Sequence, residues 1–128
     1  MYNPAGQHIL CDLYNIQNDE SLNNIEKIEN ILKHAIYLSK SKLVKIFSHQ
    51  YQPQGITTVA IIQESSFVLH SYPEQKFMSA DFFSCGTKAQ PEKGIKYLLD
   101  VLNPKEHYAQ KILRGGNTSL EISPMVKK

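Results

Sequence analysis

Three residues with reactive side chains lie in order in the middle of the chain. Ser65 directly follows Glu64, His70 comes five residues after Ser65, and Cys85 precedes a glycine. A serine hydroxyl can attack the carbonyl carbon of the residue before it, which converts an amide to an ester. Elimination and hydrolysis then leave a pyruvoyl group on the new N-terminus, and strain in a tight turn would assist the first step. Histidine is a base near neutral pH, and a thiol can donate a proton.

Each of these residues also has an ordinary structural explanation. A Glu-Ser dipeptide occurs in many turns, and an isolated strand histidine is more often hydrogen-bonded and inert. Cysteines in apolar strands are usually small buried side chains, which is the explanation we adopt for Cys11. Thr57 is a good strand former, Tyr51 is of a type more often found in cores, and Glu74 after Pro73 is more often a solvated turn acid.

Hydrophobic periodicity predicts the elements that must position these side chains. Apolar residues at helical spacing and a proline suited to a first turn predict helices over 22–36 and 91–102. Alternating or β-branched runs predict strands over 7–14, 43–51, 56–63, 67–72, 77–83 and 106–113. The segment 114–128 contains two adjacent glycines and is expected to be a flexible tail.

The order β-α-β-β-β-β-α-β predicts one α+β domain over residues 1–128. We expect a two-layer sandwich, with a mainly antiparallel sheet and two helices on one of its faces. The opposite face of such a sheet must be covered or solvated. Because the strands look apolar, we expect a second protomer to cover it, with the two sheets packing in a dimer.

Composition restricts the function classes. The formal net charge is only +2, which gives no case for a nucleic-acid or lipid surface. The two cysteines form no CxxC pair, so a disulfide framework or a zinc or other metal site is not expected. The apolar runs are too short to span a bilayer, and the start of the sequence lacks a secretory pattern. We therefore expect a cytoplasmic protein.

Five short motifs together carry a family resemblance. Pro53-Gln54-Gly55, Glu64-Ser65, His70, Pro73-Glu74 and Cys85-Gly86 follow one another in an order that resembles the bacterial and archaeal S-adenosylmethionine decarboxylase proenzymes. The resemblance runs from Gly6 to the C-terminal strand and is strongest over 49–86.

The resemblance implies roles for the reactive residues. Self-cleavage after Glu64 would give a β chain, 1–64, and an α chain, 65–128, and Ser65 would become a pyruvoyl group. His70 would assist processing and Cys85 would be the catalytic acid. Thr57 stands where the family usually has a serine near the processing site, and it keeps the hydroxyl.

The resemblance also implies a substrate and an assembly. Tyr51 would stack on adenine and Glu74 would bind the ribose hydroxyls. The pyruvoyl group would form a Schiff base with S-adenosylmethionine, and the decarboxylated product would serve spermidine and other polyamine synthesis. No metal or diffusible cofactor is implied, and the working unit would be a homodimer of processed protomers.

Four positions depart from the family pattern. A usual tryptophan is Tyr72, a usual histidine is Ser66, a usual acidic residue is Thr87, and a frequent arginine is Gln7. Two alternatives therefore remain open. The chain could be a pyruvoyl-dependent arginine or ornithine decarboxylase of the same kind, or a non-processing paralogue that regulates a partner through heterodimers.

Overall fold

The computed structural model describes residues 6–63, 65–85, 88–115 and 121–127, the last segment by its backbone only. Seven strands form one sheet in the order β2-β3-β4-β5-β1-β6-β7, and every neighbouring pair is antiparallel. The strands are β1 (Gly6–Ile16), β2 (Leu43–Gln50), β3 (Ile56–Ile62), β4 (Ser65–Tyr72), β5 (Phe77–Cys85), β6 (Pro104–Arg114) and β7 (Glu121–Lys127).

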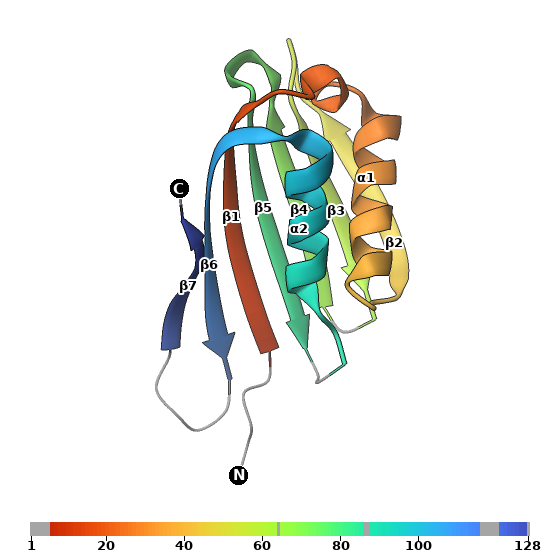
Figure 1. Cartoon of the computed structure of the whole chain (residues 1–128). Coiled ribbons are helices and arrows are strands. Elements are labelled where there is room, and N and C mark those ends of the chain that lie inside the picture. Colours follow the sequence, from red (N-terminus) through yellow and green to blue (C-terminus); the bar gives the residue numbers. More distant parts are fainter. Residues whose placement is uncertain (1–5, 64, 86–87, 116–120, 128) are drawn as a thin grey trace.

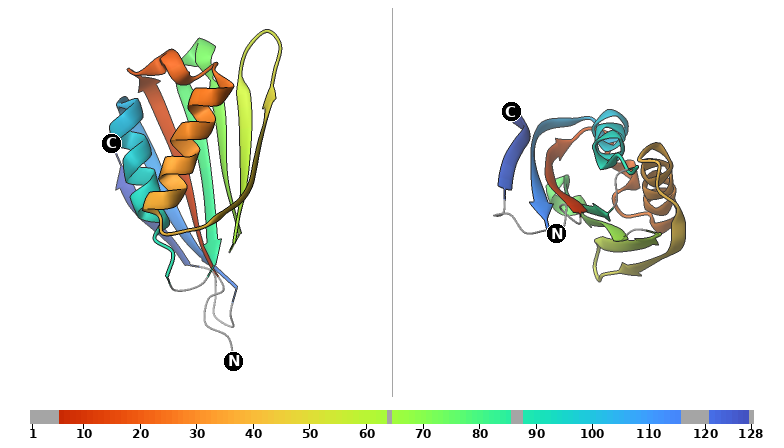
Figure 2. Two further views of the ribbon diagram at one scale, coloured as in Figure 1. Left: turned by 90° about the vertical axis from the view of Figure 1, so that its right-hand side faces the viewer. Right: turned by 90° about the horizontal axis from the view of Figure 1, so that it is seen from below.

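Two helices, α1 (Ile25–Leu38) and α2 (Pro91–Leu102), pack against the same face of the curved sheet (Figures 1 and 2). Two short 3-10 turns, η1 (Asp19–Ser21) and η2 (Pro73–Gln75), complete the elements. α1 lies over β2, β3 and β4, whereas α2 lies over β1 and β5. These observations confirm the expected α+β class and the placing of both helices on one face.

The core fills the space between the helices and the sheet. Every second residue is buried along β3 and β5 and along the middle of β1 and β4, because successive side chains point to opposite faces. Phe67 and Phe82 stack at the centre with ring centroids 4.0 Å apart. The helices contribute the apolar stripe that the sequence predicted, with the fully buried or nearly buried side chains of Ile28, Leu32, Ile36, Ile95, Leu98 and Leu102.

The helix boundaries follow from their capping residues. α1 starts at Ile25, three residues later than expected, because Asn24 has an extended backbone and its side chain accepts a hydrogen bond from the Lys27 amide at 2.9 Å. α2 starts at Pro91 as predicted, and Asn103 ends it with a left-handed φ of 50°.

The last strand corrects an expectation. The sequence predicts a flexible tail after Arg114, but β7 pairs with β6 at the edge of the sheet. Pro124 obscures this strand in the sequence, because proline lacks the amide that an inner strand needs. An edge strand tolerates proline.

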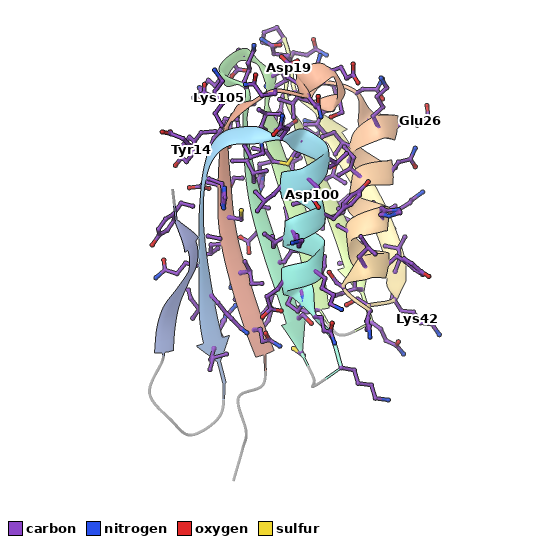
Figure 3. The ribbon with its side chains drawn as sticks, in the orientation of Figure 1. Tyr14, Asp19, Glu26, Lys42, Asp100 and Lys105 are labelled. Atoms are coloured by element: carbon purple, nitrogen blue, oxygen red, sulfur yellow. The ribbon has the colours of Figure 1, made fainter. Side chains whose placement is uncertain are left out.

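The face of the sheet opposite the helices, called the open face below, is exposed in a single chain. Among the side chains that the structure describes, six large apolar ones on this face are between 37% and 49% exposed, namely Leu10, Tyr14, Phe47, Ile61, Tyr72 and Tyr108. On the other side of the molecule, charged side chains such as Glu26 and Asp100 lie on the outer surface of the helices (Figure 3). Within the described ranges, neither helix has the length and apolarity that crossing a membrane requires.

Candidate functional site

The turn between β2 and β3 brings Tyr51 close to the start of β3. The Tyr51 amide donates to the Gly55 carbonyl at 2.8 Å, and Gly55 has a φ of 109°, which glycine adopts readily. Asn23, just before α1, accepts a hydrogen bond from the Gly55 amide at 2.9 Å. The predicted turn at Pro53-Gln54-Gly55 is therefore present and is held against the helix layer.

A chain of hydrogen bonds links three of the predicted site residues. Thr57 and His70 face each other directly across β3 and β4, and Thr57 Oγ1 lies 3.0 Å from His70 Nδ1. The Tyr51 hydroxyl lies 3.1 Å from the same Thr57 oxygen. Because the bond at Nδ1 fixes the orientation of the imidazole, Nε2 is the nitrogen left for proton transfer to a ligand.

A cavity of about 350 Å³ lies beside this chain of hydrogen bonds. Its lining includes Tyr51, Thr57, His70 and Glu74, which we call the upper cluster because it lies at the end of the sheet that is uppermost in Figure 1. Tyr72 also lines the cavity and is 41% exposed. The structure thus gathers four residues that are dispersed over 24 positions of the sequence around one space.

Ser65 and Cys85 lie at the opposite end of the sheet. Ser65 is the first residue of β4 and pairs with Ser84 of β5, whereas Cys85 is the last residue of β5 and has a free, partly buried thiol. Ser65, Ser84 and Cys85 form what we call the lower cluster. Glu64 and Gly86 lie outside the described residues, so the predicted cleavage position is described only from Ser65 onward.

The two clusters are far apart in one chain. Ser65 and His70 are five positions apart on the same strand, and a strand rises about 3.3 Å per residue, so about 17 Å separates them. A direct contact between their side chains is impossible in a single protomer. The structure therefore brings His70 to Thr57 and Tyr51, and it does not bring His70 to Ser65.

A family model described as S-adenosylmethionine decarboxylase matches residues 7–115. This chain belongs to the S-adenosylmethionine decarboxylase family. It is 32% identical over 114 residues to S-adenosylmethionine decarboxylase proenzyme 2 of Bacillus anthracis, an alignment that covers 89% of this chain and 92% of the relative. It is 36% identical over 110 residues to the S-adenosylmethionine decarboxylase proenzyme of Thermosipho africanus, which covers 86% of this chain and 84% of that protein.

A solved member of the S-adenosylmethionine decarboxylase family has a closely similar fold. The crystal structure of the adenosylmethionine decarboxylase from Aquifex aeolicus superposes with a TM-score of 0.83 at 27% identity, and it covers 92% of this chain and 97% of the other. The family resemblance drawn from the five motifs is thus confirmed over most of the chain.

Sequence reasoning missed a charged group on the open face of this family member. Arg114 donates to His8 Nδ1 at 3.1 Å, His8 Nε2 bonds to Asp81, and the Arg114 guanidinium lies 4.5 Å from the centre of the Phe83 ring. Because Nδ1 accepts from arginine, Nε2 is the ring nitrogen that donates to Asp81. Only the strand register reveals this group, since its members lie on β1, β5 and β6.

Proposed function

We propose that this chain is a self-processing, pyruvoyl-dependent decarboxylase of S-adenosylmethionine. The observation that carries the proposal is the upper cluster, in which an aromatic ring, a carboxylate and an oriented imidazole surround one cavity. The family membership supports it, because the named relatives are decarboxylase proenzymes.

The cavity suits the nucleoside part of the substrate. Tyr51 is 47% exposed and offers a flat ring on which adenine can stack. The carboxylate of Glu74 can accept hydrogen bonds from two neighbouring ribose hydroxyls. An amino acid without a nucleoside, such as arginine or ornithine, would use neither contact.

The lower cluster suits a pyruvoyl group made from Ser65. Ser65 opens a strand immediately after the short connection from β3, so a cut before it would leave the new N-terminus held in the sheet by β5. Such a group supplies a carbonyl that takes up the electron pair released when the carboxyl group leaves as carbon dioxide. Cys85 lies one position beyond the cross-strand partner of Ser65, where its thiol can return a proton to carbon.

A second copy of the chain would complete the site. Two open faces related by a two-fold axis perpendicular to the strands would place the lower cluster of one protomer against the upper cluster of its partner. The exposed apolar side chains of the open face support this packing. His70 of the partner would then approach the α-carbon of residue 65 from the open face, which the separation of about 17 Å along the strand forbids within one chain.

Intact mass under denaturing conditions tests self-processing. We expect two fragments of 64 residues, with the C-terminal fragment one ammonia lighter than a peptide that begins with serine. Carbon dioxide release from S-adenosylmethionine, arginine and ornithine then tests the substrate, and we expect turnover of the first alone. An uncut chain, or preferential release from arginine or ornithine, would contradict the corresponding half of the proposal.

A further inference from the structure

A row of polar side chains crosses three neighbouring strands beside Ser65. Ser84 of β5 pairs with Ser65 of β4 on one side and with Gln7 of β1 on the other. Phe67, Phe82 and Ile9 lie two positions from these residues along their strands and are fully buried under the helices. Because side chains alternate along a strand, the whole row projects toward the helix layer.

The Ser84 hydroxyl is buried without a partner. Ser84 is 0% exposed, and its Oγ has no hydrogen bond among the described residues, as is also true of Gln7 Oε1. Other buried hydroxyls on this face are satisfied, since Ser71 donates to the Leu22 carbonyl at 2.6 Å and Thr58 bonds to Ser48 at 2.7 Å. A buried hydroxyl without a hydrogen bond lowers stability, so its presence calls for an explanation.

Ser84 can reach the polar side chain on each side of it: its hydroxyl can donate to Gln7 Oε1, and its oxygen can accept from the Ser65 hydroxyl. Cβ atoms directly opposite each other on antiparallel strands lie about 4.5–5.5 Å apart, and serine pairs in this arrangement form cross-strand hydrogen bonds. A rotation about the Cα–Cβ bond of each serine would bring the two oxygens together. Ser65 is partly buried, so water competes weakly for this bond.

We propose that Ser84 is a positioning residue for self-cleavage, and this inference rests on the proposed function. Its oxygen accepts the hydrogen of the Ser65 hydroxyl and holds Ser65 Oγ in the rotamer from which it attacks the preceding carbonyl carbon. In that step a C–O bond forms, the C–N bond breaks, and the hydroxyl proton passes to the Ser65 nitrogen. The amide becomes an ester with no atom or electron gained or lost.

The proposal assigns Ser84 and His70 to different steps. Ser84 acts before the ester exists, whereas His70 would remove the α-proton of residue 65 after the ester has formed. Hydroxylamine cleaves esters and leaves amides intact, so it distinguishes the two steps. A chain that lacks the Ser84 hydroxyl should remain an amide for longer and accumulate no ester, whereas a chain that lacks the His70 imidazole should accumulate a hydroxylamine-sensitive ester.

The test follows cleavage of newly synthesised full-length chains by intact mass over time. We expect Ser84→Ala to slow cleavage about tenfold, which corresponds to losing one hydrogen bond whose contribution is at the upper end of the usual range. Hydroxylamine should not accelerate cleavage of this variant. Ser84→Thr keeps the hydroxyl and should recover most of the rate. Ser39→Ala is the matched control, because Ser39 is also 0% exposed with an unpartnered Oγ among the described residues but does not pair with Ser65.

Several outcomes would overturn the role of Ser84. Cleavage of Ser84→Ala at the wild-type rate, together with a raised Tm, would mean that the buried hydroxyl is merely tolerated. A hydroxylamine-sensitive ester in Ser84→Ala would place the residue after ester formation, and equal slowing in Ser84→Thr and Ser84→Ala would exclude the hydroxyl as the cause. An uncut wild-type chain would instead contradict the proposed function itself.

Discussion

The two cysteines lie on neighbouring strands in very different surroundings. Cys11 points into the core and is 1% exposed, whereas Cys85 ends its strand with a partly buried thiol. Burial, together with the nearby charge of Asp12, raises the pKa of Cys11 to about 12. Cys11 is therefore a neutral packing residue, as its sequence context predicted, and the proton donor of the proposed reaction must be Cys85.

The raised pKa of Cys11 makes part of the stability depend on pH. In the unfolded chain this thiol loses its proton near pH 9, but in the folded chain it keeps the proton to about pH 12. The contribution is therefore complete below pH 9 and is lost as the pH rises from 9 toward 12. We expect the difference in free energy of unfolding between wild type and Cys11→Ala to be constant from pH 6 to 8 and to shrink by pH 10.5. Urea titrations measure this difference, and a flat profile would contradict the burial argument.

The sequence shows which side chains could take part in the proposed chemistry, but it does not show the distances between them, which depend on strand pairing. His70 and Ser65 look close in the sequence, although two residues five positions apart on an extended strand must lie about 17 Å from each other. The importance of Ser84 was not visible, because only the register places it opposite Ser65.

At the scale of elements, the contact between the two helices depends on one glycine. A Cβ at Gly94 of α2 would lie 2.3 Å from Ser39 Oγ, 2.9 Å from the Ala35 carbonyl oxygen and 3.1 Å from the Phe82 ring. Ala35 lies in α1, and Ser39 is the residue directly after the end of that helix. The absence of a side chain at Gly94 therefore lets the two helices approach closely.

Gly94→Ala tests this packing against helix propensity. Propensity alone predicts that alanine stabilises a helix interior by about 1 kcal/mol relative to glycine. We expect the opposite sign, a loss of roughly 1–3 kcal/mol, because the helices must separate to admit the methyl group. Chemical denaturation gives the free energy of unfolding, and the exposed Lys96→Ala on the same helix is the control, with a change close to zero. A more stable Gly94→Ala would show that the gap accommodates a side chain.

The regular elements were predictable because their signals are local. Alternating or β-branched runs identified six strands, and the apolar stripe with Pro91 identified α2 from its first residue to its last. The start of α1 was misplaced because Leu22 continues the apolar periodicity but precedes the cap at Asn24. β7 was missed because its pairing with β6 is a tertiary property, and Pro124 interrupts the local pattern.

At the scale of the whole molecule, the proposed dimer makes a prediction about mixed protomers. Ser65→Ala and His70→Ala chains should each fail to cleave when expressed alone. In a heterodimer of the two, the His70→Ala chain keeps Ser65 and receives His70 from its partner, so one complete site forms. We therefore expect co-expression to restore cleavage of the His70→Ala chain alone, as measured by intact mass. Absence of cleavage in purified heterodimers would mean that Ser65 and His70 do not act across the interface.

The strand order has a consequence for a chain that has been cut before Ser65. β1, β2 and β3 would belong to one fragment and β4 to β7 to the other, yet β1 lies between β5 and β6 of the second fragment. The fragments would thus be interleaved, and neither could leave without breaking the sheet on both sides of β1. Before the cut, refolding is a unimolecular process, whereas afterwards it requires two fragments to meet and becomes dependent on concentration. Cleavage would therefore make unfolding harder to reverse, because the processed molecule keeps a fold that its separated fragments would regain only with difficulty.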